Sequence, residues 1–298
     1  MSRYRSIFLE PDWALTRYYG WQNEELAPGV KILSKRYGPA RRQLILSELD
    51  DARELRRVFH RISDRGGPTS ETILHDFANT IETDLGEARD RPLVTAGADR
   101  ILNLATYAVD LDQSEEQLLA AMSPDCRRRI RKAINDGIEV IAENAPPKAR
   151  LDLFLGELGR MAHDRGLHVP ARGILMQMFA DRRAMLFSTG SSEGGTNFVM
   201  TYRAGDKAIW LHGVGRGKSS DSGQILHWRV MQALQSTGVR WYDMGGVTGD
   251  ENNGIHRFKK GFGGEFVNLG QEYVTRAPLM RLLRAGVAGV RRLSRRAA

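Results

Sequence analysis

The order of strand and helix signals along the chain predicts an α+β fold, and two observations carry this prediction. Residues 30–37 and 43–49 are short apolar or alternating runs around Gly38-Pro39, which is typical of two strands and a turn, and residues 50–63 then carry apolar side chains at helical spacing. From residue 149 the order is helix, antiparallel strands, helix and strand. Antiparallel strands followed by helices favour an α+β layer over a doubly wound parallel sheet.

The chain length predicts two domains. Its 298 residues are enough for two units of roughly 150 residues, each with its own core. Two adjacent prolines in the segment 144–148 interrupt any helix or strand, so we expect the boundary there. The expected organisation is an N-terminal domain over 1–145, a C-terminal domain over 146–278 and a basic amphipathic tail over 279–298.

The individual elements follow from local signals. In the first half, residues 102–110 alternate like a strand, Asp112 or Ser114 can cap a helix from about Glu115, and Ser123-Pro124-Asp125 opens the next helix. That helix is expected over 126–135, with a strand at 138–142. The second half is expected to contain helices at 149–165, 173–179 and 224–236 and strands at 184–189, 196–202, 207–213 and 239–243.

Composition and charge exclude several classes of protein. The formal charge is +8, but residues 276–298 hold seven arginines and no acid, which leaves the rest of the chain at about +1 (8 − 7). A protein that binds nucleic acid over its whole surface is therefore disfavoured. The single cysteine, Cys126, makes no internal disulfide, and the chain has neither an apolar signal core nor a run of about 18 apolar residues. We therefore expect a cytoplasmic protein.

Three common chemistries lack their sequence signals. The seven histidines are scattered without a pair at metal-ligand spacing, and one cysteine cannot build a zinc site, so no metal is expected. The chain contains neither a Gly-x-Ser-x-Gly elbow nor a Walker loop. Covalent nucleophilic catalysis and nucleotide hydrolysis are therefore not expected.

The stretch 241–264 is the candidate functional site. It holds seven glycines among 24 residues, beside Asp, Asn, His, Arg and Lys side chains. Each glycine is costly to order unless its φ angle or its missing side chain is used, so this density exceeds what a simple connection needs. A strand that ends in Asp243 runs into Gly245-Gly246, and Phe258-Lys259-Lys260 precedes a second glycine cluster.

This stretch and the residues after it contain the segments Trp241-Tyr-Asp-Met-Gly-Gly, Asn253-Gly-Ile-His-Arg-Phe-Lys-Lys-Gly-Phe-Gly-Gly264 and Gly270-Gln-Glu-Tyr273. Together they resemble the C-terminal signature of the FemAB/FemX-like transferases of the GNAT superfamily. A second match spans 118–140, so the resemblance covers roughly residues 100 to 278. It implies two tandem GNAT-like domains with a cleft between them. It also implies transfer of an aminoacyl group from charged tRNA to an amine, often on a peptidoglycan precursor.

The resemblance assigns candidate catalytic roles. The family's lysine after phenylalanine corresponds to Lys259, whose ammonium could stabilise the charge that develops on the attacked carbonyl oxygen. Asp243 could accept or orient a proton, or it could only cap the Gly245-Gly246 turn, and His256 is a titratable alternative. The opposing interpretation is that Lys259 and Lys260 merely solvate a loop. Lys260, Phe258, Gly245 and Gly246 are expected substrate contacts.

Other residues are candidate phosphate or substrate contacts. The loop 213–223 joins a strand to a helix and carries Arg216 and Lys218, although Ser219 breaks the pattern by which acyl-CoA-using GNAT enzymes hold pyrophosphate. The cationic run 127–132 could hold tRNA phosphates or be a solvated helix face. The specific candidates are Arg128 and Arg131 in this run, Trp210 and His212 on the strand before the loop, and Arg172.

The sequence says less about the substrate than about the type of reaction. Family members that act on muramyl pentapeptides tend to carry an Arg and then a Tyr after the domain's first helix, whereas here Arg172 stands without the Tyr, so another acceptor remains open. The sequence predicts a FemAB-type N-acyltransferase without cofactor, with aminoacyl-tRNA as donor and a small, nucleotide-linked or lipid-linked amine as acceptor. The alternatives are an acyl-CoA-dependent GNAT enzyme and a non-catalytic module that binds a membrane surface through 279–298.

Overall fold

A computed structural model describes residues 4–81, 94–95, 100–165, 169–190, 196–215, 222–247 and 250–282. They form two compact units, and the chain passes between them more than once. Unit 1 comprises Met1–Ala14 and Ala105–Val267, and unit 2 comprises Leu15–Leu104 and Asn268–Ala298.

This division differs from the expected one, which placed the boundary between residues 145 and 146. The segment from Ala105 to 145 belongs with the residues after it, because its two strands pair with later strands of the same sheet. The prolines of 144–148 therefore mark only the connection between a strand and a helix. The cleft expected between two tandem domains stays a prediction.

Unit 1 is built on a seven-stranded mixed sheet in the order β12-β6-β11-β10-β9-β8-β7. Its strands are β6 (Ala105–Asp110), β7 (Val140–Glu143), β8 (Ala184–Thr189), β9 (Asn197–Ala204), β10 (Lys207–Gly215), β11 (Trp241–Gly246) and β12 (Glu265–Asn268). Strands β10 and β11 pair in parallel, whereas the pairs β9–β10, β8–β9 and β7–β8 are antiparallel. Antiparallel pairing of β9 with β10 confirms the hairpin predicted from the sequence.

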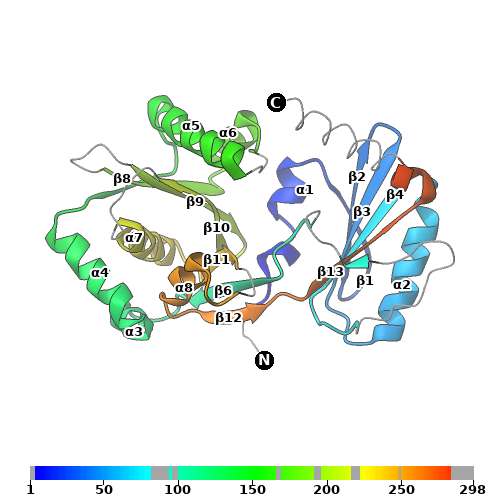
Figure 1. The fold of residues 1–298 in the computed structure, drawn as a ribbon, viewed down its shortest axis with the longest axis horizontal. Coiled ribbons are helices and arrows are strands. Elements are labelled where there is room, and N and C mark those ends of the chain that lie inside the picture. Colours follow the sequence, from blue (N-terminus) through cyan, green and yellow to red (C-terminus); the bar gives the residue numbers. More distant parts are fainter. Residues whose placement is uncertain are drawn as a thin grey trace. The chain divides into compact units, whose positions relative to one another are not determined.

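Helices cover both faces of this sheet. They are η1 (Ile7–Leu9), α3 (Glu115–Ala121), α4 (Pro124–Asn135), α5 (Lys148–Arg165), α6 (Arg172–Ala180), α7 (Ser222–Ser236) and α8 (Gly254–Lys260). Figure 1 shows α3, α4 and α7 on one side of the sheet and α5 and α6 on the other. Leu118, Ile130, Trp228, Met231 and Tyr242 are buried in the core between the sheet and the first group of helices.

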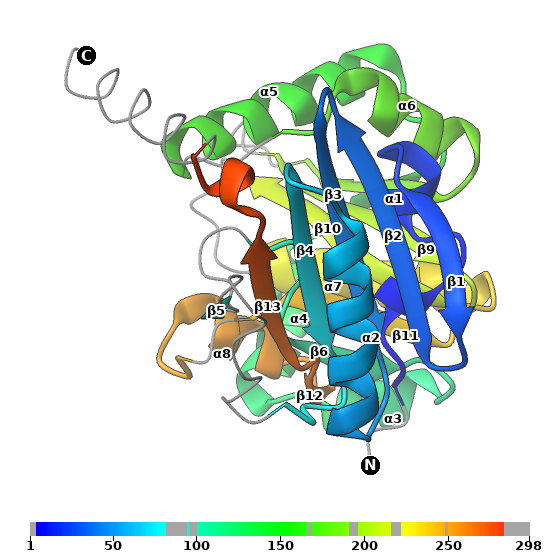
Figure 2. The ribbon, with the colours of Figure 1, turned by 90° about the vertical axis from the view of Figure 1, so that its right-hand side faces the viewer.

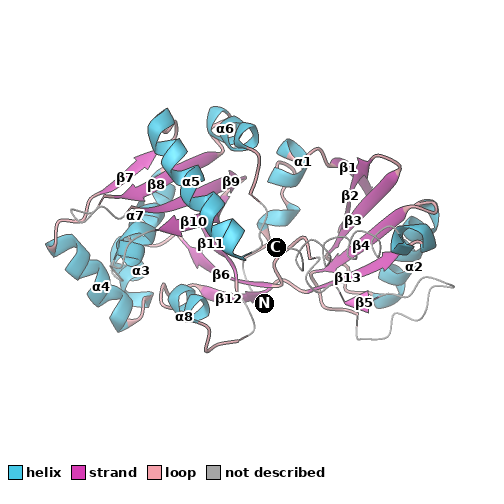
Figure 3. Cartoon of the chain, turned by 45° about the horizontal axis from the view of Figure 1, so that its top comes forward, coloured by secondary structure: helices cyan, strands magenta, loops and turns pink. Residues whose placement is uncertain are grey.

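Unit 2 carries a six-stranded sheet in the order β1-β2-β3-β4-β13-β5. Its elements are α1 (Ala14–Tyr18), β1 (Gln22–Ala27), β2 (Val30–Tyr37), β3 (Ala40–Ser47), α2 (Ala52–Arg65), β4 (Ser70–Asp76), β5 (Val94–Thr95) and β13 (Gln271–Arg276). Helix α2 packs across one face of the sheet, as Figures 2 and 3 show. Leu55, Phe59 and Ile62 of this helix are buried against Ile32 and Ile45.

The expected α+β class is confirmed, because both units are mixed sheets flanked by helices. One element was not expected from the sequence: residues 254–260 form α8, capped by the Asn253 side chain, which accepts from the Ile255 N–H at 2.9 Å. Most of the expected tail 279–298 lies outside the described residues. No helix among the described ranges is long and apolar enough to cross a membrane.

Candidate active site

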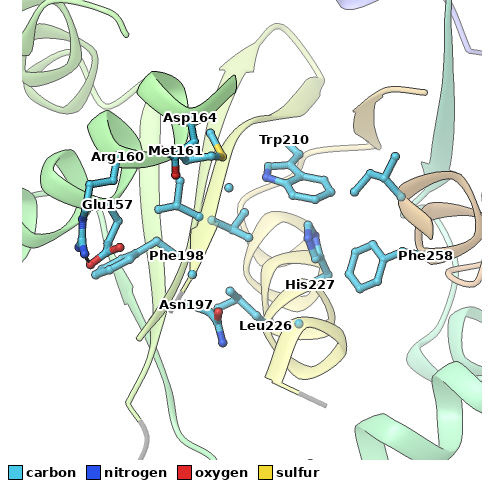
Figure 4. Close-up of a pocket in the computed structure, with 16 residues that line it drawn as sticks. Glu157, Arg160, Met161, Asp164, Asn197, Phe198, Trp210, Leu226, His227 and Phe258 are labelled. Atoms are coloured by element: carbon cyan, nitrogen blue, oxygen red, sulfur yellow. Dashed lines mark hydrogen bonds and ion pairs between the residues drawn. The ribbon is translucent and has the colours of Figure 1, made fainter. Parts of the chain in front are cut away.

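A pocket of about 590 Å³ opens at one end of the sheet of unit 1 (Figure 4). Three helices of that unit, α5, α7 and α8, supply its walls together with β9 and β10. Charged side chains from α5 form one wall, and aromatic and aliphatic side chains from β10, α7 and α8 form the other. The lining residues are Glu157, Arg160, Met161, Asp164, Asn197, Phe198, Val199, Trp210, Gly213, Val214, Gly215, Gly223, Leu226, His227, Ile255 and Phe258.

The pocket lies where two parallel strands stop pairing. The ladder between β10 and β11 runs only from Lys207 to Ile209 on the first strand, while β10 continues along β9 as far as Gly215. A register shift between Trp210 and His212 follows directly, as expected for a β-bulge. The Trp210 indole folds back over Gly213, where an added Cβ would meet the ring at 2.5 Å.

Lys259 joins the two strands at the point where they separate. Its Nζ donates a hydrogen bond to the Gly246 carbonyl at the end of β11 at 2.8 Å, and it lies 4.7 Å from the centroid of the Trp210 ring on β10. The side chain is only 5 % exposed. Burial lowers the pKa of Lys259 to about 8, although the nearby charge of Asp243 raises it.

Gly245 makes this approach possible. Its φ of +74° is in the left-handed region, and an added Cβ would lie 2.9 Å from the Trp210 carbonyl oxygen and 3.6 Å from Nζ of Lys259. Gly245 and Gly246, identified as candidates from the sequence, therefore have a defined structural role. It turns β11 sharply, so that the Gly246 carbonyl faces the Lys259 ammonium.

Asp243 is fully buried in β11. It accepts hydrogen bonds from the Tyr4 phenol at 2.6 Å, from the Thr106 hydroxyl and from the Gly245 N–H at 2.7 Å. Burial raises the pKa of Asp243, while these donors and the Lys259 charge lower it. Asp243 therefore caps the Gly245-Gly246 turn, which was one of the two roles considered from the sequence. Its charge also interacts with that of Lys259.

Two buried histidines of unit 1, His227 and His212, are held neutral. His227 on α7 lines the pocket, is fully buried, and shares a hydrogen bond of 2.8 Å between its Nδ1 and the Tyr242 hydroxyl. Burial, assisted by the Lys259 charge, lowers the pKa of His227 to about 3. Burial also lowers the pKa of His212 to about 4. Its Nε2 has no hydrogen-bond partner among the described residues.

His256 lies on α8 in a different environment. Its Nε2 is 2.9 Å from the Tyr107 hydroxyl, and its ring stacks on Phe266 at 6.2 Å. The residue is buried and does not line the pocket. This arrangement favours a packing role for His256 over direct contact with a substrate.

Comparisons with known proteins agree with this geometry. Residues 222–274, which contain α7, β11 and α8, match the model of the FemAB family. The crystal structure of FemX superposes with a TM-score of 0.61 at 14 % identity, covering 88 % of this chain and 90 % of that one. The fold of this chain is therefore similar to that of FemX. The FemAB model matches the segment that contains Asp243, Gly245 and Lys259.

Two further solved structures are similar to this chain. One is a conserved protein of unknown function from Bacteroides thetaiotaomicron, with a TM-score of 0.54 and 11 % identity over 89 % of this chain and 88 % of that one. The other is the C-terminal domain of a protein provisionally named lysylphosphatidylglycerol synthetase from Agrobacterium fabrum, with a TM-score of 0.53 and 14 % identity over 92 % and 90 %. No curated protein sequence matches the chain.

The structure brings some expected residues together and leaves others apart. Lys259, Asp243, Gly245, Gly246, Trp210 and Phe258 gather at the pocket or directly beside it. Lys260 instead is exposed and lies 3.7 Å from Glu251. Arg172 pairs with Asp152 on the outer side of α5 and α6. Arg216 and Lys218 lie outside the described residues.

Arg128 and Arg131 lie apart from the pocket of unit 1. They line a shallow cationic groove along α4. Arg128 shares Asp125 with Arg129, whereas Arg127 donates to three carbonyls at the end of α3 and is thereby structural. The cationic run is therefore partly neutralised and partly available to anions.

Sequence reasoning missed four residues of the site, namely Tyr4, Thr106, His227 and Glu157. Tyr4 and Thr106 lie 239 and 137 residues from Asp243, so only the fold brings them together. His227 had a usable signal, because it is the sole histidine in the otherwise amphipathic helix 224–236. Among the described residues, no group of three or more His, Cys, Asp or Glu side chains could hold a metal ion.

Proposed function

We propose that the chain transfers an aminoacyl group from aminoacyl-tRNA to the amine of a small acceptor, such as a cell-wall precursor. The observation that carries this proposal is the buried Lys259 ammonium beside the pocket, between the ends of β10 and β11. A buried ammonium costs free energy, so its retention at a pocket favours a role in the reaction.

The reaction needs charge stabilisation more than it needs an acid or base from the protein. The acceptor nitrogen forms a bond to the ester carbonyl carbon, and the carbon–oxygen bond to the ribose then breaks. The nitrogen loses one proton and the ribose oxygen gains one, so the enzyme supplies none overall. In the tetrahedral intermediate the former carbonyl oxygen is negative, and a fixed donor aimed at it lowers the barrier.

Lys259 is suited to that donor role. Its ammonium has three N–H groups, of which one is used by the Gly246 carbonyl. The other two can donate to an oxyanion beside Trp210. Because burial lowers the pKa of Lys259 to about 8, the ammonium form predominates at neutral pH.

Asp243 is better placed to hold Lys259 than to abstract a proton. Its carboxylate is fully buried and already receives three hydrogen bonds. An incoming amine would have to displace one of these donors. We therefore assign Asp243 an electrostatic role, in which its charge favours the protonated form of Lys259.

The proposed tRNA partner has a candidate surface on α4. The Ser123 N–H at the start of α4 donates to the Gly261 carbonyl at 2.9 Å, directly after Lys260, so the start of α4 contacts the end of α8. Exposed cations follow on α4, namely Arg128, Arg131 and Lys132. A phosphodiester backbone could follow this row while the acceptor end reaches the pocket.

Acyl-CoA is a second candidate donor, because the pocket reaches the first turn of α7. Gly223 lines it, and the Asn197 side chain donates to the Ser222 hydroxyl at 2.5 Å beside it. The N–H groups at the start of a 15-residue helix favour phosphate oxygens. This feature would suit the phosphates of coenzyme A as well as those of a tRNA end.

One experiment separates the donors. Purified protein is incubated with amine-containing small molecules from a cell extract and either a pool of tRNA charged with labelled amino acids or labelled acetyl-CoA. We expect labelled product from the tRNA pool only, and its loss when the pool is treated with ribonuclease. Product from acetyl-CoA alone would replace aminoacyl-tRNA by coenzyme A as donor, and no product from either would contradict the proposal.

A further inference from the structure

The N-terminal segment of the chain, residues 4–14, is a fixed part of unit 1. The Trp13 ring packs edge-on against Tyr202 of β9, with centroids 5.6 Å apart. The Glu10 carboxylate lies 2.6 Å from the ammonium of Lys207 at the start of β10. These contacts hold the segment against the sheet independently of Tyr4, its first described residue.

That first described residue is Tyr4, and its phenol points at the candidate active site. The ring is buried and packs edge-on against Trp241 of β11, with centroids 5.6 Å apart. The hydroxyl oxygen accepts from the Ile7 N–H at 3.1 Å, which directs the phenolic proton toward the Asp243 carboxylate at 2.6 Å. Burial raises the pKa of Tyr4 well above its usual value, so it remains a donor.

The carboxylate that Tyr4 contacts is electrostatically coupled to Lys259. Burial disfavours the charged form of Asp243, and the hydrogen bonds from Thr106, Tyr4 and Gly245 oppose that effect. The Asp243 charge in turn raises the pKa of Lys259. Among the described residues, His227 on α7 interacts with the Lys259 charge and Tyr242 on β11 with the Asp243 charge, and the Glu10 carboxylate acts on Tyr4.

We infer that Tyr4 is a positioning residue, whose phenol fixes the Asp243 carboxylate and thereby sets the state of the Lys259 ammonium. The N-terminal segment thus completes a site whose other residues come from beyond Ala105. The inference rests on the proposed function only in taking Lys259 as the group that acts on the substrate. Its tests need no substrate, so it can fail while the proposed function stands.

The first test follows the Lys259 charge through Trp210, whose fluorescence senses the ammonium 4.7 Å from its ring. The full-length protein is titrated from pH 6 to 10, and the Trp210→Phe variant supplies the background from the other tryptophans. We expect a wild-type midpoint near pH 8, which the Lys259→Met variant lacks. We expect Tyr4→Phe to shift the midpoint downward, to a value between those of wild type and Asp243→Asn.

A matched control separates positioning from anchoring of the segment. Tyr202→Phe removes a phenol that donates to the Asp12 carbonyl at 2.7 Å, in the same N-terminal segment, rather than to Asp243. We expect this variant to titrate like wild type. The inference is overturned if Tyr4→Phe keeps the wild-type midpoint, or if Tyr202→Phe shifts it as far as Tyr4→Phe does.

A second measurement leaves Tyr4 intact, so it does not depend on folding of the Tyr4→Phe variant. In protein labelled with ¹³C at the tyrosine Cζ, the Tyr4 resonance reports the hydrogen bond that its hydroxyl donates. We expect Asp243→Asn to shift this resonance, whereas Lys260→Met leaves it in place. A Tyr4 resonance that is the same in wild type and Asp243→Asn would overturn the inference.

Discussion

The ammonium of Lys259 lies 4.7 Å from the centroid of the Trp210 ring, at the point where β10 and β11 cease to pair. Parallel strands that separate leave the backbone groups at their ends without ladder partners. Lys259 satisfies one of these, the Gly246 carbonyl, and remains charged because Asp243 is close by. A single side chain thus stabilises the separation of the strands and presents a cation beside the pocket.

The first prediction concerns the pH dependence of transfer. Because the pKa of Lys259 is about 8, the ammonium form is present below that pH and is lost as the pH rises through it. The turnover number should therefore fall above about pH 8 in wild type. In Lys259→Arg the falling limb should move beyond pH 10, since a guanidinium stays protonated there. A falling limb near pH 8 in a folded, active Lys259→Arg variant would assign it to another group.

The second prediction concerns stability in acid. The unfolded His227 imidazole takes up a proton near pH 6.5, whereas the folded one does so only near pH 3, so the unfolded state binds more protons between these values. Stability should fall as the pH drops below 6.5. Between pH 6.5 and 5.0 this group alone should lower the free energy of unfolding by about 2 kcal/mol.

Urea unfolding at both pH values checks this prediction. The His227→Gln variant lacks the imidazole but retains an amide that can bond the Tyr242 hydroxyl, so it should show a correspondingly smaller decrease. An equal decrease in wild type and variant would mean that His227 already carries a proton in the folded state.

The third prediction concerns the cationic face of α4. Arg128→Glu combined with Arg131→Glu should weaken tRNA binding by roughly tenfold or more and reduce the slope of log affinity against log salt by about 2, as for two lost phosphate contacts. Filter binding over a salt series measures both quantities. Arg57→Glu with Arg61→Glu on the exposed face of α2 changes the net charge equally and is the matched control. Equal losses in the two double variants would indicate a general charge effect.

The fourth prediction concerns Gly245. Gly245→Ala should lower the free energy of unfolding through both its φ of +74° and the close Trp210 carbonyl. Gly238→Ala has a similar φ of +75° but open space around the added Cβ, so it should show only the backbone cost of about 1 kcal/mol. Thermal and denaturant unfolding of both variants measure the difference. If Gly245→Ala cost no more than Gly238→Ala, the approach of Trp210 to Gly245 would not be a constraint.

The sequence was sufficient for elements with strong local signals. Strand β8 is found over the predicted residues 184–189, and the Ser123-Pro124-Asp125 start of α4 was recognised from its cap. Helix α8 was missed because seven residues flanked by glycines carry too short a periodic pattern. The division into units was also predicted differently, because a local break such as the prolines of 144–148 does not reveal which distant strands pair.

The residues of the candidate site also differ in whether the sequence alone could identify them. Lys259, Asp243 and the glycine pair could be found because chemistry-bearing residues cluster within one short stretch of sequence. Tyr4 could not be found, because its link to Asp243 spans 239 residues and depends on the sheet. The exposed position of Lys260 next to the buried Lys259 could not be deduced either, since only the helical geometry of α8 places adjacent lysines in different environments.

That pair of adjacent lysines provides the most direct test of the central claim, which is that the buried ammonium stabilises the reacting carbonyl. Single-turnover transfer of a labelled amino acid from charged tRNA is compared in wild type, Lys259→Met and Lys260→Met. The account predicts a rate that is lower by about 10²–10³-fold in Lys259→Met and within a few fold of wild type in Lys260→Met. A folded Lys259→Met variant that transfers at the wild-type rate would contradict it.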